Sequence, residues 1–462
     1  MYNSRQVDYF SKQILLPDGW KTNVRFGVNS SGEFTEIQEN AEPAGASVIE
    51  GIVVPGMPNL HSHAFQRAMA GMSEFAVAGE NNFWSWRQTM YKLANLMTPE
   101  QIRVVAAQLY MEMLKAGYTS VAEFHYLHHD FKGKPYAATD ETCTQLIDAA
   151  CQTGIGLSLL PVLYMSADIS GRSPATEQAR FAHDIDSYIA LFESLLDKQS
   201  EQLRTGMAFH SLRAVPIDAL LAVIGYYSES FSDHPLHIHI AEQPKELEEC
   251  LQVYGNTPVQ CLFDEVDVNQ HWCLVHATHV SADEIALMAD SHCVVGLCPT
   301  TEANLGDGIF PLQEFLTKGG SIGIGSDSHV SVSPVEELRW LEYGQRLISQ
   351  QRNNVADESE SHSGARLWNA TLNGGARALG RNVGSIASGQ RADLLVLDDS
   401  HPLLYARPPE QVLDSLIFAG NSNLIKDVMV GACWQVKDAR HKQEDEIVFA
   451  FNKVMHELIS KL

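Results

Sequence analysis

The stretch GMPNLHSH, residues 56–63, joins an apolar, strand-like segment to two histidines placed two positions apart. The residues from Ile52 to Met57 are mostly apolar, and His61 and His63 follow them. Side chains at alternate positions of a strand point the same way, so both imidazoles would share one face. Such a pair either binds a metal ion or lies on the surface of a loop, and the pair alone does not decide between the two.

Seven more segments of this apolar, β-rich kind follow, separated by longer helix-like stretches. The eight segments are GMPNLHSH (56–63), YTSVAEFHY (118–126), GIGLSLLPVLY (154–164), GMAFHSL (206–212), PLHIHIAE (235–242), WCLVHATH (272–279), CVVGLCPTT (293–301) and SIGIGSDSH (321–329). Continuous apolar strands that alternate with helices indicate a parallel sheet covered by helices. Eight such units predict an α/β protein with a (β/α)8 TIM-like barrel, a fold that typically takes roughly 250 residues.

The two ends of the chain show a different pattern, with short alternating runs and turn signals between them. We therefore expect a small β-sandwich domain built from both chain ends. The expected boundaries are 1–55 for the first part of this domain, 56–383 for the barrel, 384–440 for the second part of the domain, and 441–462 for a C-terminal amphipathic helix.

Composition limits the classes of partner. The chain has 462 residues and a formal net charge of −25 at pH 7, so its surface repels nucleic acid and anionic membranes. Its eight cysteines are scattered without a C-x-x-C pair, which is typical of reduced thiols in a cytoplasmic protein. The sequence has no start of signal-peptide type and no segment apolar enough to span a membrane.

Polar residues collect at the expected carboxyl ends of four strands, where a (β/α)8 barrel places its active site. They are His61 and His63 on the first strand, His239 and Glu242 on the fifth, His276 and His279 on the sixth, and Asp327 on the eighth. Three histidines and an aspartate suit a borderline cation that keeps an open position for water. The whole set therefore favours a metal site for the first histidine pair.

The remaining histidines have simpler interpretations, based on their spacing and their neighbours. We expect a core position for His237, loop positions for His125, His128 and His129, positions in solvent or behind the ligands for His279 and His329, and surface positions for His292 and His362. None of them is expected to bind the metal.

The ligand pattern resembles the mononuclear deaminase branch of the amidohydrolase superfamily. The resemblance covers nearly the whole chain and includes the divided β-domain and the stretch SGQRADLLVLD (388–398). The fourth segment continues as MAFHSLRAVP (207–216) and offers no lysine of the kind that binuclear members carboxylate.

Longer motifs resemble the formimidoylglutamate deiminase family within that superfamily. They are LLPDGW (15–20), PGMPNLHSHAFQRAMAG (55–71), HIAEQ (239–243), CPTTEANLGDG (298–308) and GSDSHVSVSPVEELRWLEYGQRL (325–347). The resemblance implies hydrolytic deamination of N-formimino-L-glutamate to N-formyl-L-glutamate and ammonia, in histidine degradation. It also implies a homodimer with one Zn²⁺ per chain, although Fe²⁺ or Mn²⁺ would tolerate the same ligands.

The resemblance assigns roles to individual residues. His61, His63, His239 and Asp327 would hold the metal, which lowers the pKa of a bound water to about 7. Asp327 would also accept the proton of that water. Glu242 would act as general acid and base on the imine nitrogen, and His276 would orient the water and stabilise the tetrahedral intermediate.

The implied substrate is a dicarboxylate, and an acidic chain must supply local cations for it. Arg87 and Arg213 lie in stretches expected to be loops facing the site, and arginine binds a carboxylate through two parallel hydrogen bonds. The resemblance adds Gln66, Tyr126 and His210 as hydrogen-bonding partners. Tyr126 could instead be a core residue with a bonded hydroxyl, and Arg213 a surface charge at the start of a helix.

Three other functions stay open. A related deaminase could act on a purine or pyrimidine base such as guanine or cytosine, but a neutral base would not need two arginines. A hydrolase could cleave the amidine to formamide and glutamate instead. A catalytically inactive metal-binding protein could share the fold, although a purely structural site would need neither Glu242 nor His276.

Overall fold

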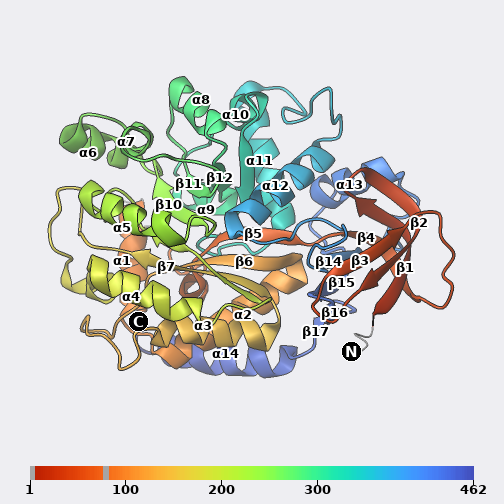
Figure 1. Ribbon diagram of the computed structural model, residues 1–462, viewed down its shortest axis with the longest axis horizontal. Coiled ribbons are helices and arrows are strands. Elements are labelled where there is room, and N and C mark those ends of the chain that lie inside the picture. The colour runs from red at the N-terminus through yellow and green to blue at the C-terminus, as the bar shows by residue number, and fades with distance from the viewer. Residues whose placement is uncertain (1–5, 76–82) are drawn as a thin grey trace.

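The computed structural model describes residues 6–75 and 83–462, and two sheets organise them (Figure 1). In these residues the central sheet is a nearly closed barrel of eight parallel strands in chain order, and a bridge between Ser62 and Asp327 joins its first and last strands. The barrel strands are β5 (Met57–Ser62), β6 (Tyr118–His125), β7 (Gly156–Leu163), β9 (Met207–Phe209), β10 (Leu236–Ile240), β11 (Trp272–His276), β12 (Val294–Leu297) and β13 (Ser321–Ile324). Each expected segment contains one of them, so the barrel prediction is confirmed.

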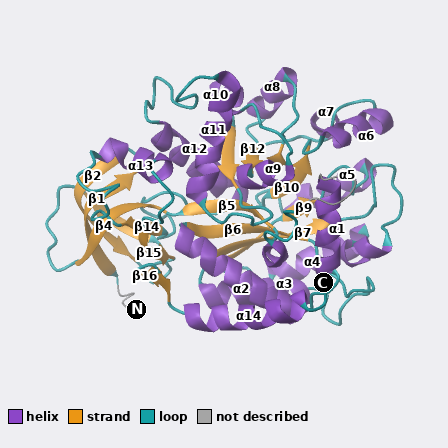
Figure 2. Cartoon of the chain, turned by 180° about the vertical axis from the view of Figure 1, so that it is seen from behind, coloured by secondary structure: helices purple, strands orange, loops and turns teal. Residues whose placement is uncertain are grey.

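Helices surround the barrel and connect its strands (Figures 1 and 2). They are α1 (Phe83–Ala94), α2 (Pro99–Ala116), α3 (Glu141–Thr153), α4 (Ile185–Leu196), α5 (Ile217–Ser230), α6 (Pro244–Tyr254), α7 (Pro258–Glu265), α8 (Ala282–Asp290), α9 (Pro299–Leu305), α10 (Leu312–Thr317), α11 (Pro334–Ser349) and α12 (Ser363–Leu379). Every residue of β6 and β7 is buried, because side chains on both faces of these strands are covered. This double burial explains why the strands read as continuous apolar runs.

Two of the expected strands differ in detail. The seventh segment is a strand only over β12, because Pro299 then occupies the first turn of α9, where the missing N–H costs nothing. The fourth strand is divided into β8 (Leu203–Thr205) and β9 at Gly206. A Cβ atom at that glycine would lie 2.6 Å from the Leu160 side chain and from the carbonyl oxygen of Pro235.

The second sheet joins both ends of the chain, as expected. Within the described residues its strands are β1 (Val7–Leu16), β2 (Gly19–Val28), β3 (Phe34–Gln38), β4 (Ser47–Pro55), β14 (Leu394–Leu397), β15 (Ile425–Val430), β16 (Cys433–Lys437) and β17 (Arg440–His441). The pair β4 and β14 brings the two halves together in antiparallel register, with Val53 opposite Val396. The domain has a hydrophobic core of its own, which includes Phe26, Val53 and Met429.

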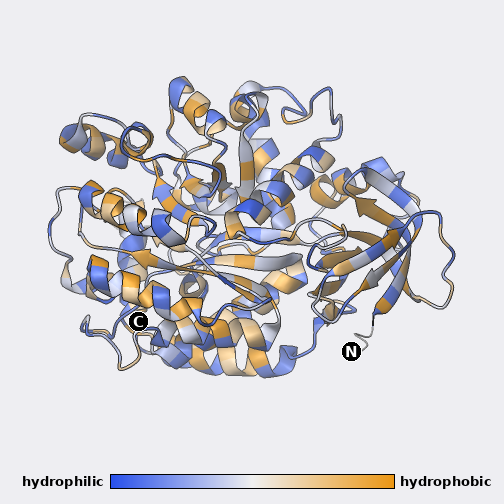
Figure 3. Ribbon diagram, viewed as in Figure 1, coloured by the Kyte–Doolittle hydropathy of each residue, from blue (hydrophilic) through white to orange (hydrophobic). Residues whose placement is uncertain are grey.

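Two helices from the C-terminal part of the chain pack on the helices of the barrel, α13 (Val412–Phe418) between β14 and β15 and α14 (Glu444–Ile459) after β17. The helix α13 packs against α11 and α12, and α14 lies along α2 (Figure 1). Lys115 of α2 and Glu444 of α14 form an ion pair of 2.8 Å. In the hydropathy colouring of Figure 3, orange segments lie on both strands and helices, mixed with white and blue ones. Among the helices of the described ranges, none is long and apolar enough to cross a membrane.

Close packing of α12 on the barrel gives a first testable prediction. A Cβ atom at Gly374 of α12 would lie 1.9 Å from the carbonyl oxygen of Ile322 in β13. We expect Gly374→Ala to lower the free energy of unfolding by about 1–3 kcal/mol, because backbone must shift to admit the methyl group. The matched variant is Gly225→Ala in α5, where nothing lies within 4 Å of the new atom. It should raise the stability by about 0.5–1 kcal/mol. Denaturant titration measures the free energy of unfolding of both variants, and equal changes in that free energy would contradict the prediction.

Candidate metal and active site

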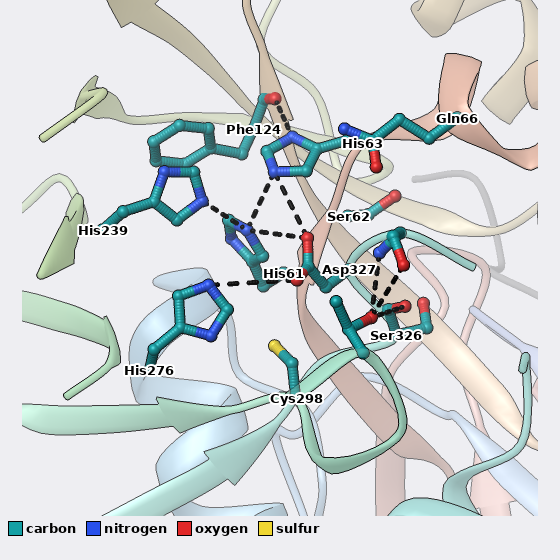
Figure 4. A network of polar contacts seen from close by, with 12 residues as sticks. His61, Ser62, His63, Gln66, Phe124, His239, His276, Cys298, Ser326 and Asp327 are labelled. Atoms are coloured by element: carbon teal, nitrogen blue, oxygen red, sulfur yellow. Dashed lines mark hydrogen bonds and ion pairs between the residues drawn. The ribbon is translucent and has the colours of Figure 1, made fainter. Parts of the chain in front are cut away.

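Three imidazoles and one carboxylate meet at the carboxyl end of the barrel (Figure 4). His61 belongs to β5 and His63 follows it, His239 belongs to β10, and Asp327 lies just after β13. The Nε2 atom of His61 lies 3.1 Å from that of His63 and 2.9 Å from that of His239. Oδ1 of Asp327 lies 3.6 Å and 3.4 Å from the Nε2 atoms of His61 and His63.

The hydrogen bonds behind two of these rings fix the nitrogen that faces the site. Nδ1 of His63 donates to the carbonyl oxygen of Phe124 (2.9 Å), and Nδ1 of His239 donates to that of His210 (3.0 Å). Their Nε2 atoms are therefore lone-pair acceptors, and both lie close to Nε2 of His61. His61 has no such fixed tautomer, because its buried Nδ1 has no partner within the described residues.

This arrangement fits a small cation. Burial lowers the pKa of His63 to about 3 and holds the pKa values of His61 and His239 well below the usual range, so the three rings are neutral, as metal ligands must be. Tetrahedral Zn²⁺ with bonds of 2.0–2.1 Å would hold its nitrogen ligands about 3.3 Å apart, close to the spacing of His61 and His63.

Two side chains of the site extend from residues with strained backbone conformations. His276 and Asp327 have φ angles of +72° and +45°, in the left-handed region that non-glycine residues rarely adopt. Each such conformation costs about 1–3 kcal/mol and persists only where the surroundings enforce it. Both residues lie at strand ends where the chain turns sharply, so the strain directs an imidazole and a carboxylate to the same point.

His276 is surrounded by carboxylates. Its Nδ1 lies 3.2 Å from Glu302, and its Nε2 lies 3.9 Å from both Glu242 and Asp327. Burial alone would lower the pKa of His276, but the three acidic neighbours raise it to about 10. The ring is therefore a cation at neutral pH, with one N–H directed between Glu242 and Asp327.

One cavity of about 50 Å³ collects nearly all the predicted site residues. Its lining contains His63, Gln66, Arg87, Tyr126, His210, Arg213, His239, Glu242, His276 and Asp327, whereas His61 lies fully buried behind them. The side-chain amide of Gln66 donates to the Tyr126 hydroxyl at 2.9 Å, and its Oε1 has no partner within the described residues. Tyr126 is thus a buried residue with a bonded hydroxyl that also reaches the cavity.

The two arginines differ from each other. Arg87 was expected in a loop, but it lies on α1, because the connection between β5 and α2 forms a helix of its own. Its guanidinium donates to the Tyr164 hydroxyl at 3.2 Å. Arg213 follows β9 and is buried beside Glu242 (3.6 Å) and Glu246 (3.9 Å), so it is not a surface charge.

Comparison with known proteins identifies the family. The amidohydrolase family model matches residues 52–434. The chain belongs to the amidohydrolase family. A model described as the N-terminal domain of formimidoylglutamate deiminase HutF matches residues 9–48. Formimidoylglutamate deiminase of Pseudomonas aeruginosa is 49% identical over 97% of this chain and 99% of its own length.

Solved structures agree with this amidohydrolase assignment. The crystal structure of an amidohydrolase from Brucella melitensis has a TM-score of 0.92 and 43% identity, and the match covers 98% of this chain and 100% of that one. A zinc-bound adenosine deaminase from Xanthomonas campestris shares the fold, with a TM-score of 0.81 at 19% identity and 98% of both chains covered.

The amidohydrolase site also depends on residues that the sequence did not reveal. Glu123 of β6 accepts hydrogen bonds from the Ser62 hydroxyl (2.6 Å) and from the backbone N–H of Ala64 (2.6 Å), and so holds the segment that carries the first two histidines. Burial raises the pKa of Glu123 to about 7, although these bonds oppose the rise. The sequence offers one indication of this role, because Glu123 is the only acidic residue in its strand.

A second group of hydrogen bonds joins the first strand of the barrel to the segment after its last strand. Nε2 of His329 accepts from the backbone N–H of His63 at 3.2 Å, and its Nδ1 donates to the Ser326 hydroxyl at 3.0 Å. The same hydroxyl accepts from the side-chain amide of Asn59 at 2.6 Å. His329 is fully buried, so its place is behind the ligands and not in solvent.

The other histidines mostly serve the packing. His237 is fully buried and bonds the carbonyl oxygen of Ala378 at 2.7 Å, as expected of a core residue. The loop interpretation is wrong for His125, which ends β6 and is buried, and His128 and His129 lie in a loop that is itself buried. His125 and His128 lie near Cys143, but Nε2 of His125 already bonds the Thr142 hydroxyl at 2.9 Å.

Proposed function

We propose that this chain is a zinc-dependent hydrolase that deaminates N-formimino-L-glutamate to N-formyl-L-glutamate and ammonia in histidine degradation. The observation that carries the proposal is one cavity in which His63, His239 and Asp327, three of the four proposed metal ligands, lie beside two arginines. The amidohydrolase family supports the hydrolytic chemistry, and the relative from Pseudomonas aeruginosa supports the substrate.

His61, His63, His239 and Asp327 would hold one divalent cation, and three nitrogens with one oxygen favour Zn²⁺, although Fe²⁺ and Mn²⁺ accept the same donors. When bound, the cation would lower the pKa of a water molecule to about 7 and so supply a nucleophile at neutral pH. Asp327 would accept the proton of that water. Its Oδ2 lies 3.9 Å from Nε2 of His276, which stabilises the carboxylate.

Glu242 carries the proton transfers on the substrate. The reaction breaks the bond between the formimino carbon and its terminal nitrogen, and water supplies the oxygen of the formyl product. Both protons that the leaving nitrogen gains derive from the attacking water: Glu242 protonates the imine nitrogen, takes up the remaining proton of that water, and delivers it to the same nitrogen, which leaves as ammonia. The His276 cation, 3.9 Å away, stabilises the negative charge that develops on the attacking oxygen.

The other cavity residues bind the amino-acid part of the substrate. Arg87 and Arg213 supply fixed positive charge in the cavity for the carboxylates of the substrate, although the chain as a whole has a net charge of −25. Gln66 offers to a substrate N–H a carbonyl oxygen that no described residue bonds, and Tyr126 and His210 line the same cavity. His210 is neutral, because burial and the nearby arginines hold its pKa well below the usual range.

The proposal also includes a homodimer in the cytoplasm. All eight cysteines are free, which suits a reducing compartment. The helix α11 exposes Trp340, Leu347 and Ile348, which a second copy would cover.

A product assay tests the function. The purified protein, loaded with zinc, is incubated with N-formimino-L-glutamate, guanine or cytosine while ammonia and the organic product are followed. We expect ammonia and N-formyl-L-glutamate from the first compound and no turnover of the two bases. Formamide with glutamate would contradict the bond assignment, whereas ammonia from a base alone would favour the ring-deaminase alternative. No turnover of any compound would favour the inactive metal-binding alternative.

A further inference from the structure

The turn between α9 and α10 carries a buried aspartate that the mechanism does not use. Asp307 is 3% exposed, and its backbone N–H donates to the carbonyl oxygen of Glu302 at 2.9 Å. Gly306 and Gly308 on either side have φ angles of +73° and +131°, conformations that glycine adopts without strain. Leu305, two residues before Asp307, lines the active-site cavity, so this turn borders the site.

The side chain of Asp307 joins this turn to the segment that carries Glu242. Its Oδ1 accepts a hydrogen bond from the side-chain amide of Gln243, 64 residues earlier in the chain. Gln243 is the N-cap residue of α6, yet its side chain makes no capping bond to that helix. Because Gln243 directly follows Glu242, its contact with Asp307 holds the chain next to the proton-transfer group.

The backbone at Glu242 needs such support. The preceding residue, Ala241, has a φ angle of +51°, a left-handed conformation that persists only where the surroundings enforce it. Glu246 of α6 is 1% exposed and accepts from the backbone N–H groups of Ala241 and Glu242, at 3.2 Å each. Glu246 therefore holds the segment from its own helix, and Asp307 holds it through Gln243 from the turn after α9.

The carboxyl group of Asp307 suits this role because it is neutral. Burial raises the pKa of Asp307 to about 9, and the negative charge of Glu242 adds to the rise, although the His276 cation opposes it. At neutral pH the group keeps its proton, so it accepts the Gln243 hydrogen bond without placing another charge beside Glu242. Asparagine has nearly the same shape as this neutral acid and carries no charge.

We propose that Asp307 is a positioning residue, which holds Glu242 in place for proton transfer through its hydrogen bond with Gln243. The preceding helix supports the neighbouring catalytic group, because Glu302 of α9 lies 3.2 Å from Nδ1 of His276. The helix α9 and its following turn thus hold both groups that act on the reacting atoms. This inference rests on the proposed function, because it concerns the deamination of N-formimino-L-glutamate.

The test measures kcat, KM and metal content of Asp307→Ala and Asp307→Asn at neutral pH. We expect Asp307→Ala to lower kcat about 10–100-fold, because Glu242 is no longer held at the reacting nitrogen. KM should change less than about threefold and metal content not at all, because the lost bond contacts neither substrate nor metal. Asp307→Asn should keep kcat within about threefold of wild type, because its amide oxygen still accepts from Gln243.

A second variant removes the same hydrogen bond from its other side. Gln243→Met, at the start of α6, should lower kcat by about the same factor as Asp307→Ala. In the double variant the two losses should not multiply, because both changes remove one contact. The control is Asp398→Ala, which removes a turn aspartate after β14, where its carboxylate accepts from the backbone N–H of Ser400 at 3.0 Å. This control should leave kcat unchanged.

Wild-type kcat in Asp307→Ala would overturn the role of Asp307. An equal loss in Asp307→Asn, a change confined to KM, a loss of metal, or losses that multiply in the double variant would overturn it as well. If Asp307→Ala does not fold, Gln243→Met decides, and wild-type kcat in that variant would overturn the role. Wild-type protein that does not deaminate N-formimino-L-glutamate would contradict the proposed function itself, which is a different result from a failure of Asp307 in an active enzyme.

Discussion

Replacing Glu242 by glutamine should lower kcat by about 10²–10⁴-fold while the protein stays folded and keeps its metal. The amide has nearly the shape of the carboxylate, but it cannot take up or deliver a proton at neutral pH. Glu242 is 5% exposed and lies 3.9 Å from Nε2 of His276, inside the cavity that holds the metal-ligand set. Steady-state kinetics with N-formimino-L-glutamate measure kcat, and elemental analysis of the purified variant measures its metal content.

The matched control is Glu248→Gln, which removes an exposed carboxylate from α6, the helix that follows Glu242. It should leave kcat and metal content unchanged. A Glu242→Gln variant with kcat within tenfold of wild type would show that another group moves the proton. A variant that loses metal would instead show that Glu242 supports the ligand set.

The barrel could be predicted from the sequence because its strands are buried on both faces. Strands such as β6 and β7 therefore stand out as apolar runs between helices. The convergence of His61, His63, His239 and Asp327 could be predicted because histidine and aspartate at strand ends interrupt those runs at a place where the fold gathers them. A family resemblance then added Gln66, Tyr126 and His210, whose spacing alone indicates nothing.

The supports behind the site could not be predicted, because they join residues far apart in the chain. The bonds of Asn59 with Ser326 and of His63 with His329 cross the closure of the barrel, and no local periodicity encodes them. Glu123 and His329 are single polar residues, and sequence alone does not distinguish a buried support from a surface charge. The burial of His125 and His128 escaped prediction for the same reason, since loops are normally assigned to the surface.

Replacing His63 by asparagine should abolish metal binding and reduce activity at least about 100-fold. Nε2 of His63 lies 3.1 Å from that of His61 and 3.4 Å from Asp327, so its loss opens one side of the ligand set. The wild-type apoprotein, prepared with a chelator, should gain thermal stability when Zn²⁺ is added. The gain is about 2.7 kcal/mol when free metal is 100 times Kd, because only the folded protein offers the assembled site. The variant should show no such gain, and elemental analysis should find it nearly free of metal.

His128→Asn provides the matched control, because it also removes a fully buried imidazole, one whose Nε2 bonds the carbonyl oxygen of Val162 at 3.2 Å. This variant should lose stability with and without Zn²⁺, yet keep the wild-type gain on adding metal and about one metal ion per chain. The comparison separates loss of a ligand from loss of packing, since both changes remove a buried ring but only His63 faces the other ligands. Metal loss in His128→Asn with retention in His63→Asn would instead place the metal at His125, His128 and Cys143, another buried group whose donor atoms lie close together.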